Sequence, residues 1–283
     1  MKTLVLANQK GGVGKSAIAS QLAFFFAYRG KRVLHLDLDH QCNSSSVIIK
    51  SGLAVAAGCS ASEVLAGGVV EVPDAVFVVV AGDTMLSGLE RQPERHNAFV
   101  AALRDFLHEV AVRFDVCIID TNPNPDIRYA AALIVADFLL SPVELNQEAI
   151  DGIAALLHHP RYGVLKIIRV MNPGLKVIGI LPNMVEATPF QRSNLAQLVA
   201  AHSKLLIALP GEADRYAFVP TRTAIAEAQA CGVPLWQLRH AVPAGQTGRV
   251  DPQSMQLRTA AREAWREVRP VFEEIERRMG LGS

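Results

Sequence analysis

The chain has 283 residues, of which half are hydrophobic and 19% are charged, and its formal net charge is +1. This composition is typical of a globular protein and excludes a chain coated uniformly in basic charge for nucleic acid. The four cysteines form no CxxC pair, which excludes a zinc site of that spacing and a disulfide framework and indicates a cytoplasmic protein. No apolar run approaches the length of a membrane helix, so we expect no integral membrane segment.

Short apolar runs alternate with longer helical patterns along the chain. The predicted strands are Thr3–Asn8, Arg32–Leu38, Val76–Ala81, Asp115–Asp120, Phe138–Pro142, Lys176–Pro182 and Leu205–Leu209. The predicted helices are Lys15–Arg29, Ala98–Val112, Ile127–Ala136, Gln147–His158, Phe190–His202, Thr221–Ala230 and Gln253–Met279. Several strands are almost wholly apolar, as in parallel sheets covered by helices on both faces. The pattern predicts an α/β fold with a doubly wound, mostly parallel sheet.

The C-terminal part of the chain predicts a helical tail on a single domain. No linker or repeat divides residues 1–283, and the least regular stretch, Ala241–Pro252, predicts a loop ahead of a helix over residues 253–279. Apolar residues recur in this helix at helical spacing, which favours packing on the domain. A membrane-binding helix is the alternative, but Pro270 interrupts the pattern and several glutamates would oppose anionic lipid.

A glycine-rich segment joins the first predicted strand to the first predicted helix, which is the context of a phosphate-binding loop. It reads Asn8-Gln9-Lys10-Gly11-Gly12-Val13-Gly14-Lys15-Ser16. Its backbone N–H groups would surround phosphate, Lys15 would reach the β- and γ-phosphates, and Ser16 would bind Mg²⁺ through its hydroxyl. The first glycine of the usual motif is replaced by Gln9, and a second lysine, Lys10, stands inside the loop. We assign nucleotide binding to Lys10, Gly11, Gly12, Val13, Gly14, Lys15, Ser16 and Ala17.

Acidic residues end two of the predicted strands. The second strand ends in Asp37-Leu38-Asp39, and the fourth ends in Asp120 after four apolar residues. The carboxyl ends of parallel strands meet at the edge of the sheet where ligands bind, so these carboxylates should lie near the phosphates. The sequence therefore predicts a Mg²⁺ site of Ser16, Asp39 and Asp120, with strand-end capping as the alternative role for either aspartate alone.

Together these motifs resemble the ParA/MinD family of ATPases with a deviant phosphate-binding loop. The family loop matches Lys10 to Ser16 residue for residue. The family element D-x-D-P-Q-G-N is similar to residues 37–43, with His40 in place of proline and Cys42 in place of glycine. The family segment D-[TC]-P-P is similar to residues 120–123, with Asn122 in place of proline. The likeness extends from Thr3 to about Met279 and is greatest to short plasmid-type ParA proteins.

The resemblance implies an ATPase that uses ATP and Mg²⁺ and hydrolyses ATP slowly until a ParB-type partner stimulates it. ATP would drive a homodimer in which Lys10 of each subunit reaches the nucleotide of the other, and Asp39 would position the attacking water. Adenine contacts would come from Asn183 and Pro210, although the segment Gly211–Pro220 looks longer than usual. The dimer would bind DNA without sequence preference through Arg192 and Arg222, and would associate with the nucleoid.

Two other functions remain open on the sequence. A MinD-like ATPase would position a protein complex or cycle on a membrane, and this is the main alternative. A metabolic enzyme with a phosphate-binding loop, or a member of the nitrogenase iron-protein branch, is the other. That branch uses paired cluster cysteines, and Cys117 and Cys231 lack the surrounding motif.

Overall fold

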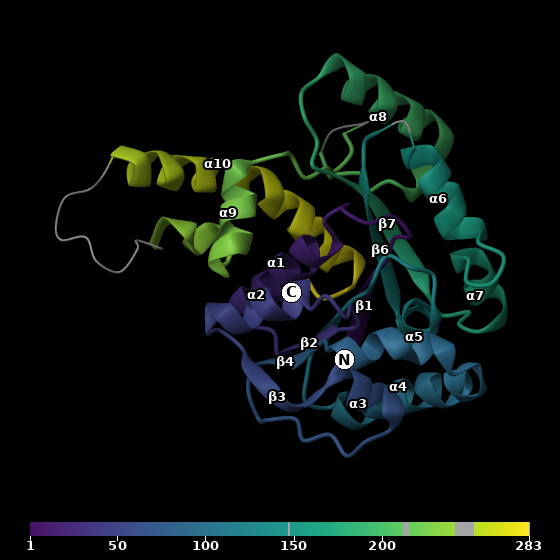
Figure 1. The fold of residues 1–283 in the computed structure, drawn as a ribbon. Coiled ribbons are helices and arrows are strands. Elements are labelled where there is room, and N and C mark those ends of the chain that lie inside the picture. Colours follow the sequence, from purple (N-terminus) through teal and green to yellow (C-terminus); the bar gives the residue numbers. More distant parts are fainter. Residues whose placement is uncertain (147, 212–214, 241–251, 283) are drawn as a thin grey trace.

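The computed structural model describes residues 1–146, 148–211, 215–240 and 252–282 (Figure 1). Within them, seven strands form one sheet in the order β3-β4-β2-β5-β1-β6-β7, and all their pairings are parallel. Their bounds are β1 Lys2–Leu6, β2 Val33–Asp37, β3 Val55–Ser60, β4 Phe77–Ala81, β5 Val116–Asp120, β6 Phe138–Glu144 and β7 Lys176–Asn183. The predicted doubly wound α/β fold is confirmed.

Helices cover both faces of the sheet. Their bounds are α1 Lys15–Tyr28, α2 Asn43–Ser51, α3 Ala61–Ala66, α4 His96–Val110, α5 Ile127–Val135, α6 Ala149–His158, α7 Val164–Val170, α8 Pro189–His202, α9 Thr223–Cys231 and α10 Pro252–Arg278. One apolar core lies between the sheet and α3 to α8, and a second lies between the sheet and α1, α2, α9 and α10 (Figure 1). Strands buried on both faces explain the apolar runs in the sequence.

One predicted strand is wrong, and one strand was missed. The segment Leu205–Leu209 instead has a 3-10 turn at Ser203–Leu205 followed by single bridges, one of which joins Leu206 to Ile180 of β7. The side chain of Ile207 fills the space above Gly179, so apolar burial there does not require a strand. The missed strand is β3, whose residues are mostly small and partly exposed and include only one β-branched side chain, Val55.

The last helix packs on the domain. Val268, Phe272 and Ile275 of α10 are buried, as is Met279 just after it, and the ring of Phe272 lies 5.7 Å from that of Phe25 in α1. This packing leaves the apolar face of α10 unavailable to a bilayer. In the described part of the chain, no helix combines the length and apolar character needed to span a membrane. The predicted loop over residues 241–251 lies outside the described residues.

Phe272→Ala should lower the free energy of unfolding by about 3–5 kcal/mol, because it leaves a cavity in the core between α10 and α1. Denaturant unfolding monitored by circular dichroism measures the loss. The matched control is Phe190→Ala, whose ring is 57% exposed and whose loss should change stability little. Equal losses in the two variants would show that α10 does not contribute to the core.

Candidate active site

The phosphate-binding loop joins the central strand β1 to α1. The chain leaves β1 after Leu6 and enters α1 at Lys15, with Gly14 as the residue before the helix. Gly12 and Gly14 have φ values of 77° and 82°, a region that side chains strongly disfavour. At Gly14 a Cβ atom would also lie 2.2 Å from Nδ2 of Asn183. Glycine is therefore required there, and the backbone N–H groups of the helix start remain accessible to an anion.

Side chains from neighbouring strands hold this loop in place. The Nδ2 of Asn8 donates to the carbonyl of Pro142 in β6 at 2.7 Å, and its Oδ1 accepts from the backbone N of Lys10 at 2.8 Å. Farther along, Nδ2 of Asn183 in β7 donates to the carbonyl of Val13 at 2.9 Å. The amide nitrogen of Asn183 is thus engaged with the loop itself. Its predicted adenine contact could use the amide oxygen or the second N–H of the amide, and it stays a prediction.

The two lysines of the loop occupy different environments. Lys15 is buried, and its Nζ donates to the carbonyl of Lys10 at 3.1 Å. Burial lowers the pKa of Lys15, while Asp120 and Asp39 partly oppose that shift. Lys10 instead points outward, where its Nζ lies 2.7 Å from Oε2 of Glu148. The side chain of Lys10 is 32% exposed and turned away from the loop, whereas that of Lys15 lies inside it.

Two carboxylates meet at the carboxyl edge of the sheet, but only one is satisfied. Asp37 and Asp120 are paired in register on β2 and β5, and both are buried. Asp37 accepts from the backbone N of Asp39 and from both the N and Oγ of Ser45, at 2.7 to 3.0 Å. Asp37 therefore fixes the start of α2. Neither oxygen of Asp120 makes a hydrogen bond to another described residue, although the hydroxyls of Ser16 and Ser44 lie near enough to favour its charged form.

This unsatisfied carboxylate matches the chemistry of a divalent cation. Burial, followed by the charge of Asp37, raises the pKa of Asp120 to about 7, while the hydroxyls of Ser16 and Ser44 and the charge of Lys15 lower it. A buried carboxylate that lacks a partner is costly unless a cation or proton compensates it. Ser16 and Asp120 together offer the oxygen ligands that Mg²⁺ prefers, which supports their assignment as its ligands.

The loop after β2 carries Asp39 and the residues that depart from the family motif. Asp39 is buried, and its Oδ1 accepts from the backbone N of Gln41 at 3.0 Å. Cys42, where the family has glycine, has a φ of 55° and precedes α2. The left-handed backbone explains the family glycine and strains the cysteine that replaces it. His40 contacts Arg128 of α5, a residue to which the sequence drew no attention.

A cavity of about 470 Å³ lies over the loop. Of the predicted residues, its lining contains Gly11, Gly12, Gly14, Lys15, Ser16, Ala17 and Asp39. Its lining also contains residues that the sequence analysis did not assign to the site: Gln41, Asn43, Val47, Pro123 and Gln229. Neither Asn183 nor Pro210 lines it, and Pro210 is exposed. Gln229 comes from α9, more than 200 residues after the loop, and the sequence analysis did not single it out.

The predicted DNA contacts lie far along the chain from the loop. Arg192 is exposed on α8. Arg222 immediately precedes α9, and its guanidinium makes two hydrogen bonds of 2.7 and 2.9 Å to Glu267 of α10. The predicted DNA contact of Arg222 would therefore compete with an existing ion pair.

The chain is similar to known proteins over most of its length. A family model described as an AAA domain matches residues 1–177. Protein IncC from Escherichia coli is 35% identical, over 99% of this chain and 71% of its own length. The chromosome-partitioning ATPase Soj from Thermus thermophilus is 32% identical, over 82% of this chain and 86% of its own. The McdA–ATP complex from Cyanothece shares the fold with a TM-score of 0.72, covering 100% of this chain and 98% of its own at 19% identity.

Asp120→Asn should stabilise the protein in the absence of nucleotide and Mg²⁺. Native Asp120 keeps its proton up to about pH 7, whereas an ordinary aspartate releases it near 3.8, so the ligand-free protein loses stability as the pH rises between these values. The variant lacks this loss and should melt at a higher temperature than the parent at about pH 8. The exposed Asp105→Asn serves as a control. A variant that melts no higher than the parent would show that the carboxylate is already compensated.

Proposed function

Because the chain belongs to the ParA/Soj family of partition ATPases, we propose that it is an ATP-driven switch that segregates DNA. The observation that carries this proposal is the phosphate-binding loop that holds Lys15 inward beside the unpartnered Asp120 while Lys10 points outward. A loop that bound phosphate in isolation would have no use for a second lysine on its outer side.

We assign ATP binding to Lys15 and to the backbone N–H groups of the loop, from Lys10 to Ala17. Ser16 and Asp120 would hold Mg²⁺, with Asp39 beside them, and the metal would offset phosphate charge when bound. Asp39 lines the cavity and is the carboxylate best placed to orient the attacking water. Asn183 and Pro210 remain the proposed adenine contacts. Hydrolysis would be Mg²⁺-dependent and slow until a partner stimulates it.

We infer that Lys10 acts between two copies of the chain. Turning Lys10 inward would place its ammonium group beside that of Lys15, at a like-charge cost. In its outward position Lys10 pairs with Glu148, whose side chain is 76% exposed, so solvent screens this contact and makes it easy to exchange. The phosphates of a facing subunit would be a stronger partner because they carry more negative charge. ATP would thus couple nucleotide binding to dimer formation.

Lys10→Ala should still bind ATP as a monomer but lose the ATP-dependent homodimer. Sedimentation of an Asp39→Ala protein, which should bind ATP without turnover, with and without the Lys10 change, is the direct test. Glu148→Gln is the matched control, because it removes the same ion pair and spares the lysine. It should form the dimer at least as readily as the parent. A dimer that persists undiminished in the Lys10 variant would remove this lysine from the switch.

The proposed cargo contact is non-specific DNA, bound by the ATP dimer through Arg192 and Arg222 in the cytoplasm at the nucleoid. Dimerisation would double a patch that is weak in the monomer. A ParB-type protein bound to the segregated DNA would be the stimulating partner. The alternative of a MinD-like cycle on a membrane lacks support at α10, whose apolar face is buried against α1.

The ATP form should bind duplexes of any sequence, and its affinity should fall steeply as salt rises, because phosphate contacts release counterions. Arg192→Ala and Arg222→Ala should each weaken binding to all sequences alike and reduce the salt slope by about one. Glu267→Gln should tighten binding, since it releases Arg222 and removes a negative charge. Arg104→Ala on α4, which lies across the sheet from Arg222, is the control. Fluorescence anisotropy with two unrelated duplexes measures these effects, and no binding at low salt would exclude this function.

A further inference from the structure

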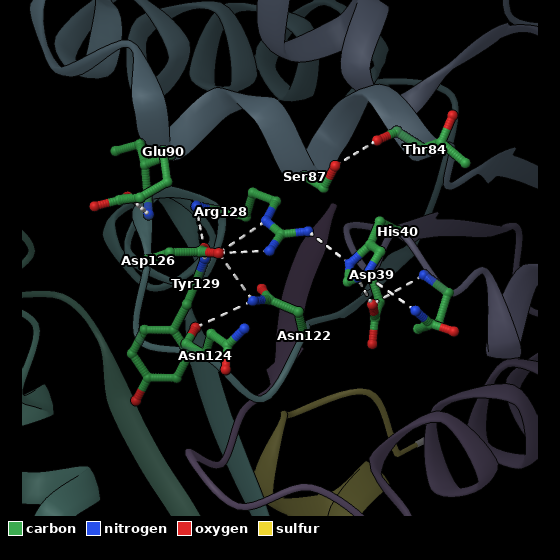
Figure 2. A network of polar contacts seen from close by, with 12 residues as sticks. Asp39, His40, Thr84, Ser87, Glu90, Asn122, Asn124, Asp126, Arg128 and Tyr129 are labelled. Carbon is green, nitrogen blue, oxygen red and sulfur yellow. Dashed lines mark hydrogen bonds and ion pairs between the residues drawn. The ribbon is translucent and has the colours of Figure 1, made fainter.

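A chain of polar contacts links the loop after β2 to the start of α5 (Figure 2). It runs from Asp126, at the start of α5, through the guanidinium of Arg128 to the imidazole of His40, which lies next to Asp39. Figure 2 shows Arg128 lying between Asp126 and His40. Arg128 and His40 are 88 residues apart in sequence, and Asp39, beside His40, lines the cavity over the phosphate-binding loop.

Arg128 is held in one orientation by the residues around it. The side chain is only 4% exposed, and both Nε and Nη2 donate to Oδ2 of Asp126. The other oxygen of Asp126 accepts from the backbone N of Arg128 and so caps α5. Nδ2 of Asn122 also donates to Asp126, at 3.0 Å. A paired guanidinium of this kind is a rigid fork, and its remaining Nη1 points away from Asp126.

The contact with His40 determines what the imidazole can offer Asp39. Nδ1 of His40 lies 3.2 Å from Nη1 of Arg128 and 3.3 Å from Oδ1 of Asp39. An arginine can only donate hydrogen bonds, so Nδ1 accepts and carries no proton in this arrangement. The proton then sits on Nε2, which lies 3.0 Å from Nε2 of Gln41, so a hydrogen bond between them requires the Gln41 amide to turn its oxygen toward the imidazole. His40 therefore gives no hydrogen bond to Asp39 and leaves that carboxylate available to water.

Two of the residues that depart from the family motif belong to this network. His40 and Asn122 both replace prolines of the family pattern, and both contribute side-chain hydrogen bonds here that proline cannot make. Arg128 joins them through Asp126. The substitutions thus occur together in one connected structure that tethers the loop of Asp39 to the loop that follows Asp120.

We propose that Arg128, acting through His40, is a positioning residue that fixes Asp39 for ATP hydrolysis. This inference rests on the proposed ATPase function and adds residues that bind no part of the nucleotide. Arg128 and His40 do not line the cavity over the phosphate-binding loop. Losing their contact lets the loop that carries Asp39 move, while the phosphate-binding loop and Lys15 keep their geometry. Turnover therefore falls without a matching loss of ATP affinity.

Steady-state ATPase kinetics on three variants test the proposal. His40→Leu removes the acceptor and should lower kcat by roughly 10- to 100-fold, as a misplacement of about 1 Å does, with KM for ATP changed by less than about 3-fold. His40→Asn places an amide oxygen near the position of Nδ1 and should recover much of that loss. Arg161→Met is the matched control: Arg161 pairs with Glu90, which also braces the start of α5, but Arg161 does not contact His40. Its kcat should equal that of the parent.

A double-mutant cycle tests whether Arg128 and His40 affect kcat through the same interaction. Arg128→Met combined with His40→Leu should lose no more turnover than the more severe single variant, whereas additive losses would overturn the proposal. Thermal unfolding of each variant separates a folding defect from lost positioning. Should Arg128→Met not fold, the His40 pair decides alone: equal kcat for His40→Leu and His40→Asn overturns the proposal. A parent protein without ATPase activity would reject the proposed function itself, and this inference with it.

Discussion

The repulsion between Asp37 and Asp120, paired in register at the buried end of two adjacent strands, is the constraint on which the site depends. The fold resolves one half of it with its own atoms, because the start of α2 satisfies Asp37. The charge of Asp120 is left to Lys15, whose burial lowers its own pKa, and to a cation that binds with the nucleotide. The electrostatic free energy of the site is therefore least favourable when no ligand is bound. Stability given up at a binding site in this way is returned when the ligand binds.

The sequence predicted the central part of this arrangement because the signals there are local. The glycines and lysine of the loop, and the aspartates at the ends of apolar runs, are fixed by neighbours within about ten residues. Prediction from the sequence failed where contacts between distant segments decide the conformation. Ile207 is buried against Gly179 without forming a strand, and β3 lies at an edge where its small residues carry no period. Gln229 lines the cavity only because α9 packs beside α1 and α2, which no local pattern reveals.

The departures from the family motif are informative in different ways. Cys42 keeps the left-handed backbone of the glycine it replaces and so adds strain without a visible new contact to the nucleotide cavity. His40 and Asn122 instead exchange the stiffness of proline for side-chain hydrogen bonds to Arg128 and Asp126. In the sequence alone, Cys42, His40 and Asn122 are equally mismatches to the family motif. Only the spatial arrangement distinguishes a tolerated substitution from residues that rebuild the rigidity of the loops in another form.

Helix α9 reaches from the nucleotide cavity to the face on which Arg222 lies, and it ends at an exposed thiol. Gln229 lines the cavity, Arg222 precedes the first turn, and Cys231 is the last residue of the helix. Burial raises the pKa of the thiols of Cys42, Cys59 and Cys117, which makes them slow to react. A maleimide dye would thus attach to Cys231 first, without any engineered cysteine. Its emission would follow the arrival of nucleotide beside the same end of the helix and would test the proposed docking of DNA at the other end, in the native sequence.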